Sequence, residues 1–148
     1  MVLAEGIGVV AAPLYELQDK GPGYASFSNG NDVFIARVIK LPAYTDPGRR
    51  CVDEPSSVNR GASALKIPPP QPVNGNPSLQ IATCQSSAIY SDGGGSRIAH
   101  AGGVVSVRLS DGVTVIGTVL FNTSSVPSQL NQDVSAMVNS MLRDQARR

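Results

Sequence analysis

Residues 97–121 read RIAHAGGVVSVRLSDGVTVIGTVLF, with two runs rich in valine, isoleucine and threonine on either side of Asp111-Gly112. These residue types favour extended backbone, and Asp-Gly is a frequent hairpin turn. The sequence therefore predicts strands at 97–109 and 113–121. A three-residue loop pairing Leu109 with Val113 would gather most of the valines on one face. We expect this register because a one-residue slip would move the whole buried set to the other face.

More strands are predicted upstream of this hairpin, near residues 7–12, 24–28, 32–41 and 79–90. Asn29-Gly30 is a strong hairpin signal between the second and third of them. Residues 32–41 are apolar on both faces of an extended chain, which is typical of a strand covered on both sides. We therefore expect this segment in the interior of the sheet.

The C-terminal part of the chain carries the clearest helical pattern, over residues 130–142. Its apolar residues recur at the spacing of one helix face, and they are Leu130, Val134, Met137, Val138, Met141 and Leu142. The predicted fold class is therefore α+β: a single, mostly antiparallel sheet with a C-terminal amphipathic helix packed on one face.

The length of 148 residues corresponds to one domain, and we expect residues 1–148 to form it. A long proline-rich excursion within it, 42–78, contains eight of the eleven prolines. Loops of that length without secondary structure are uncommon in compact domains. A short helix near 56–66 could interrupt the excursion.

The two cysteines, Cys51 and Cys84, predict one disulfide. In a chain rich in serine, glycine and proline, such a bridge points to an exported protein. The bridge would close a loop of about 33 residues and stabilise the fold by roughly 3–4 kcal/mol in the chain-entropy model. The alternative is two buried thiols in a cytosolic protein.

The charge balance excludes some partners. Twelve Lys and Arg face eleven Asp and Glu, for a net charge of +1, without the basic excess of a nucleic-acid binder.

No segment reaches the roughly 18 apolar residues of a membrane span, so we expect no integral span in this chain. Residues 1–12 contain Glu5 and have no basic start, so they match a secretory signal poorly. A signal or anchor outside this sequence remains an option.

Few residues could support catalysis, and we expect no cofactor and no metal. His100 is the single histidine, so a hydrolase would combine it with a serine and an acid such as Asp92 or Asp111. A Gly-x-Ser-x-Gly motif is missing. One histidine and two distant cysteines also lack the spacing of a zinc site.

Composition and layout together resemble small exported envelope proteins and lipoproteins of actinobacteria. Arg outnumbers Lys nine to three, and the order is strands, a proline-rich excursion, more strands and a terminal helix. Some of those proteins adopt an α/β sandwich like the Mog1/PsbP family. The resemblance implies an envelope location, but no functional residue, and the chain has no lipobox cysteine near Met1.

The leading hypothesis is a non-catalytic, exported bacterial domain that binds a protein partner or a lipid-like apolar ligand at the cell envelope, whether periplasmic, envelope-bound or secreted. An apolar ligand would lie between sheet and helix and contact Val134, Met137 and Met141. The alternatives are a small hydrolase using His100, and a structural subunit that self-assembles through an exposed strand edge.

Overall fold

The computed structural model describes residues 1–30, 32–51, 71–73, 76–92, 95–121 and 128–147, with backbone alone for 85–101, 121 and 128–131. Short helical structure occurs at 47–51. The other elements in chain order are β1 Val2–Ala4, β2 Ile7–Gly8, β3 Glu16–Gly21, β4 Tyr24–Ser28, β5 Val33–Lys40, β6 Gln71–Val73, β7 Asn76–Asp92, β8 Gly95–Arg108, β9 Val113–Phe121 and α2 Ser128–Ala146. No described helix is long and apolar enough to cross a membrane.

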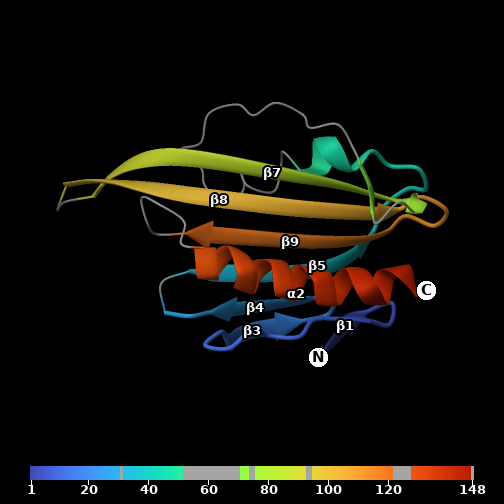
Figure 1. Cartoon of the computed structure of the whole chain (residues 1–148), viewed down its shortest axis with the longest axis horizontal. Helices are drawn as coiled ribbons and strands as arrows, with labels where there is room; N and C mark the ends of the chain where they lie inside the picture. Colours follow the sequence, from blue (N-terminus) through green and yellow to red (C-terminus); the bar gives the residue numbers. More distant parts are fainter. Residues whose placement is uncertain (31, 52–70, 74–75, 93–94, 122–127, 148) are drawn as a thin grey trace.

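Within the described residues, seven strands form one sheet in the order β3-β4-β5-β9-β8-β7-β6, and each neighbouring pair is antiparallel. The helix α2 crosses one face of this sheet (Figure 1). The predicted α+β class, the mostly antiparallel sheet and the C-terminal helix on one face are therefore confirmed. β5 lies inside the sheet between β4 and β9, as its two apolar faces predicted.

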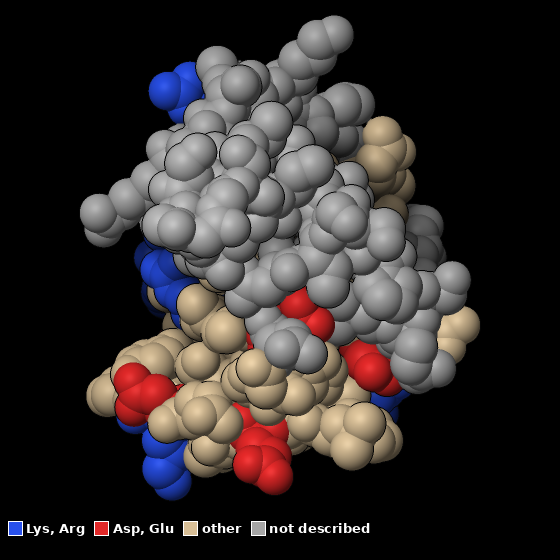
Figure 2. All heavy atoms as spheres, turned by 90° about the vertical axis from the view of Figure 1, so that its left-hand side faces the viewer, with Lys and Arg blue, Asp and Glu red and all other residues tan. Residues whose placement is uncertain are grey.

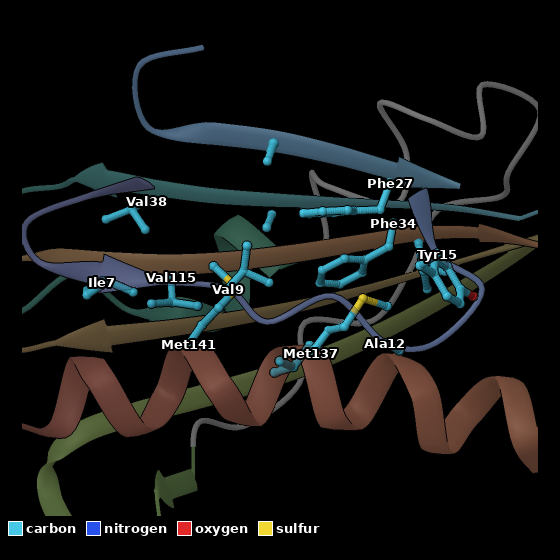
Figure 3. Packing of buried hydrophobic residues seen from close by; sticks show 14 of the residues in the cluster. Ile7, Val9, Ala12, Tyr15, Phe27, Phe34, Val38, Val115, Met137 and Met141 are labelled. Carbon is cyan, nitrogen blue, oxygen red and sulfur yellow. The ribbon is translucent and has the colours of Figure 1, made fainter. Parts of the chain in front are cut away.

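The helix-side face carries the larger core. Phe34 and Val38 of β5 and Val115 of β9 pack there against Met137 and Met141 of α2 (Figure 3). Phe27 and Ile7 extend the same cluster toward β4 and the short β1–β2 hairpin. The apolar stripe of α2 therefore packs against this face of the sheet.

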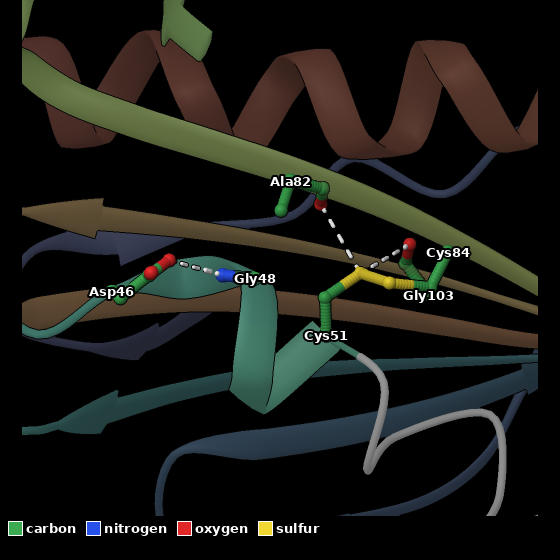
Figure 4. The surroundings of a disulfide bond; sticks show 6 residues. All are labelled: Asp46, Gly48, Cys51, Ala82, Cys84 and Gly103. Carbon is green, nitrogen blue, oxygen red and sulfur yellow. Dashed lines mark hydrogen bonds between the residues drawn. A yellow bond between two sulfur atoms is a disulfide. The ribbon is translucent and has the colours of Figure 1, made fainter. Parts of the chain in front are cut away.

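The opposite face carries a second core around the disulfide between Cys51 and Cys84, whose Cα atoms lie 5.8 Å apart. The Cys51 Sγ atom also lies 3.4 Å from the carbonyl oxygens of Ala82 and Gly103 (Figure 4). A bridged sulfur has no proton to donate, so these are packing contacts. The predicted bridge is confirmed, and it ties the segment at 47–51 to the sheet.

The register of the β8–β9 hairpin differs from the prediction. Val107 is paired with Thr114 and Ser106 with Val115, so the three-residue loop is wrong and residues 109–112 form the connection. The expectation assumed one buried face, whereas both faces are covered. Val115 packs under the helix while Val107 packs toward the disulfide. Each face therefore holds a mixture of valine and polar residues.

Two further expectations concern less regular segments. Instead of a strand over 7–12, Ile7–Gly8 forms a two-residue strand, and the following residues run beside α2. Within the proline-rich excursion 42–78, helical structure at 47–51 and β6 are described. The helix predicted near 56–66 lies outside the described residues.

Candidate functional site

The helix α2 is hydrogen-bonded to the chain along one of its flanks. The Gly8 N–H donates to Asp144 Oδ2 at 2.9 Å, and the Val10 N–H donates to Ser140 Oγ at 3.0 Å. Both bonds hold residues 8–10 against the helix, because each pairs a backbone N–H of this segment with a side chain of α2. This flank of α2 is closed.

The C-terminal end of α2 is fixed to the sheet by Gln145, whose side chain is completely buried. Its Nε2 donates to the carbonyl oxygens of Ser106 and Val113 at 2.9 and 3.0 Å, and its Oε1 accepts from Ser106 Oγ at 2.7 Å. Arg108 adds a bond from Nη1 to the Gln145 carbonyl oxygen at 3.1 Å. These bonds set the height of the helix end above β8 and β9.

Beneath the helix the packing is close. A Cβ atom at Gly117 of β9 would lie 3.1 Å from Val138 Cγ2, so this glycine lets helix and strand approach. Met137 and Met141 are both 0 % exposed, and Val134 packs against the same cluster half-buried. The structure thus brings the three predicted ligand-contact residues together, but as part of the core. Ligand contact at these positions stays a prediction, and it requires helix and sheet to separate.

The other flank of α2 borders an open groove of about 780 Å³, within the range of small-molecule sites. Its floor includes Leu79 and Ile81, which share the helix-side face of β7. The groove exists because the sheet continues past the helix to β7 and β6. The described residues that line the groove are Pro72, Val73, Asn76, Leu79, Ile81, Asn139, Leu142, Arg143, Ala146 and Arg147.

The groove is apolar below and cationic at its rim. Leu79 is 2 % exposed, and Ile81 and Leu142 are half-buried, whereas Arg143 and Arg147 are exposed. Within the described part of the chain, no aspartate or glutamate lines the groove and neither guanidinium has an ion pair. By contrast, acidic and basic side chains are interspersed on the described surface at the other end of the molecule (Figure 2).

The catalytic alternative finds no support in the register. His100 is paired with Ser87 and Phe121, so Asp92 lies five residues along β7, about 17 Å away at 3.4 Å per residue. Asp111 follows the far end of β8, and its carboxylate is bound by both Arg108 Nε and Nη2, at 2.7–3.1 Å. That ion pair lowers the pKa of Asp111 to about 2. Neither acid proposed for a His100 triad is therefore within reach of it.

The cysteines and the buried Tyr15 have structural roles rather than reactive side chains. The disulfide leaves no free cysteine in the described chain. Burial, followed by the charges of Asp32 and Asp133, raises the pKa of Tyr15 to about 12, so its phenol stays protonated within the core. No cluster of three or more His, Cys, Asp or Glu that could hold a metal occurs among the described residues.

The two edge strands of the described sheet are β3 and the short β6, and β3 is the longer of the two. Its side chains are exposed and include Glu16, Asp19 and Lys20. Charges on an edge strand discourage pairing with another copy. Assembly through an edge stays a prediction.

The chain matches no protein family model and no curated protein. Among solved structures, it is similar to LpqN, described as involved in cell envelope biogenesis of Mycobacterium tuberculosis, with 13% identity and a TM-score of 0.46 over 91% of this chain and 79% of that one. It is also similar to a protein of Bacteroides thetaiotaomicron, with 13% identity and a TM-score of 0.45 over 89% of this chain. It spans 44% of the length of the Bacteroides protein.

Proposed function

We propose that this protein is a non-catalytic domain of the cell envelope that binds an elongated apolar ligand in the groove between α2 and β7. The observation that carries the proposal is an open groove of about 780 Å³ with an apolar floor, beside a helix fixed on its other flank. Ile81 and Leu142 leave part of the apolar groove surface accessible to water, and a ligand that covers this surface lowers the free energy of the system.

The disulfide supports the location. Disulfides persist in oxidising compartments outside the cytoplasm and are rare where thiols are kept reduced. The bridge between Cys51 and Cys84 joins the segment at 47–51 to β7, the strand that forms the groove floor on its opposite face. The disulfide thus constrains β7, and β7 contributes the floor of the proposed site.

The first experiment is native mass spectrometry of the full chain made in an oxidising compartment. The expected spectrum shows the loss of two hydrogens and an additional mass that leaves on activation. Because the chain has no tryptophan, an Asn139→Trp variant then places a sole indole at the groove rim. Its fluorescence is expected to shift on titration with oleyl alcohol, used as a neutral single-chain probe. A Leu14→Trp variant, with the indole on an exposed loop, should not respond.

The matched pair Ile81→Thr and Ile39→Thr, each made in the Asn139→Trp protein, tests the site itself. Both isoleucines are half-buried strand residues, but Ile81 lines the groove and Ile39 faces the other core. Only Ile81→Thr should weaken binding, by a factor of about ten, because it removes apolar contact from the floor. Equal effects of the two changes, or no binding of the probe at all, would overturn the proposal. If Met141→Ala alone changed the affinity, the ligand would lie beneath the helix instead.

A further inference from the structure

We propose, on the basis of the function proposed above, that the ligand is a long-chain carboxylate whose headgroup is bound by Arg143 and Arg147. Arg143 lies in the last turn of α2, and Arg147 directly follows the last residue of the helix, Ala146, in a turn closed by the bond from its N–H to the Asp144 carbonyl oxygen. Both line the groove whose floor is formed by Leu79 and Ile81. The site thus has a cationic rim directly beside an apolar floor.

At the C-terminal end of α2 and in the turn that follows it, acidic and basic side chains lie on different flanks. Asp144 accepts the Gly8 N–H on the closed flank, while Arg143 and Arg147 border the groove. Since the described residues that line the groove include no acid, an anion would face two cations and no carboxylate from this part of the chain. A ligand with a negative headgroup fits this field, and a cationic one does not.

Arginines near a helix C-terminus also have a simpler role, because they offset the negative end of the helix dipole. That role would be fulfilled on any side of the helix end, so it does not explain why both arginines border a groove with an apolar floor. The dipole does oppose an anion close to the last carbonyl groups. The headgroup must therefore be held by the extended guanidinium groups, away from the helix end.

The geometry of the cation favours a carboxylate. A guanidinium donates two parallel hydrogen bonds to one carboxylate, and these charge-assisted bonds are stronger than neutral ones. Asn139 and Asn76 add neutral polar groups at the rim. The acyl chain would lie along the floor at Leu79 and Ile81 and beside Leu142, and the half-buried Ile81 and Leu142 provide the apolar surface that it would cover.

The test compares probes that share one chain and differ in the headgroup. The oxidised Asn139→Trp protein is titrated at pH 7 and low salt with oleate, oleyl alcohol and oleylamine, each below its aggregation threshold. Oleate is expected to bind about tenfold more tightly than oleyl alcohol, and oleylamine more weakly than either. In R143Q/R147Q the oleate preference should disappear while the affinity for oleyl alcohol is kept. The control K20Q/R49Q removes the same net charge from exposed positions outside the groove and should keep the preference.

Each outcome separates this inference from the function on which it rests. If oleate and oleyl alcohol bind equally, and Ile81→Thr weakens both, the headgroup assignment fails while groove binding stands. A preference that survives in R143Q/R147Q overturns it as well, because the anion would then be recognised elsewhere. Tighter binding of oleoyl lysophosphatidate than of oleate would replace the carboxylate by a phosphate. Binding of none of the probes would refute both proposals.

Discussion

The buried amide of Gln145 should be worth several kilocalories per mole, and Gln145→Leu tests this directly. Leucine has a similar size but no polar atoms, so the change removes three hydrogen bonds of 2.7–3.0 Å to Ser106 and Val113. It leaves the Ser106 hydroxyl and two strand carbonyl oxygens without this partner. The site is completely buried, so water cannot easily replace the amide.

The magnitude follows from the cost of losing a buried partner. An unsatisfied buried polar group costs about 1–3 kcal/mol, and leucine regains part of this through its greater hydrophobicity. For two carbonyls and a hydroxyl that can rotate, we expect a net loss of about 2–4 kcal/mol in the free energy of unfolding. A domain of this kind has only about 5–15 kcal/mol in total.

The assay is urea unfolding of the oxidised protein, followed by far-ultraviolet circular dichroism because the chain has no tryptophan. The matched control is Gln132→Leu, which makes the same change at an exposed position of α2 and should stay within about 0.5 kcal/mol. The double variant Ser106→Ala/Gln145→Leu should lose less than the sum of its two single variants, since they share a bond. A loss for Gln145→Leu no larger than for Gln132→Leu would refute the idea that this amide fixes the helix end.

Three other changes test the frame around the groove. Reduction of the Cys51–Cys84 bridge opens a loop with a sequence separation of 33 and should lower the free energy of unfolding by about 3.7 kcal/mol in the chain-entropy model. The measurement compares the urea midpoint with and without reductant, and an unchanged midpoint would contradict this expectation. Gly112→Ala should destabilise by more than about 1 kcal/mol, because Gly112 has φ +76° and an added Cβ would collide with a backbone carbonyl; a variant as stable as the parent in thermal unfolding would count against that conformation. Arg108 lowers the folded pKa of Asp111 to about 2, below its usual 3.8, so the stabilisation is present above pH 4 and is lost as the pH falls toward 2. Asp111→Asn should flatten the pH dependence of the urea midpoint in that window, and parallel curves for variant and parent would argue against the ion pair.

Local pattern was sufficient to predict much of this fold. The apolar stripe over 130–142 predicted α2, and the β-branched run at 113–121 coincides with β9. The hairpin register could not be obtained in the same way. Rules that maximise one apolar face apply to a sheet with one dry side, and here α2 covers one face while the segment at Cys51 packs on the other. Because both faces are buried, the number of valines on each face no longer determines the register in which β8 and β9 pair.

The groove was also beyond sequence reasoning, because it depends on how far the sheet extends past the helix. Two local signals were nonetheless present. Leu79 and Ile81 alternate on one face of β7, and Arg143 and Arg147 follow the helical repeat on a side separate from Met141. Neither pattern indicates that the leucine–isoleucine pair and the arginine pair line the same groove. Their meeting results from the sheet order, which places β7 next to β8 and beyond the helix.

The two possible ligand positions differ in what the protein must do before binding. A ligand in the groove leaves α2 in place, so its association needs no rearrangement of the helix. A ligand beneath the helix, at Met137 and Met141, first requires loss of the bonds made by Ser140, Asp144 and Gln145. Its apparent affinity would be reduced by the fraction of molecules in that open state. Weakening the helix end with Gln145→Leu should therefore increase the affinity of a ligand under the helix and should not increase that of a ligand in the groove. The same variant that measures stability thus distinguishes the two sites when it is titrated with oleyl alcohol.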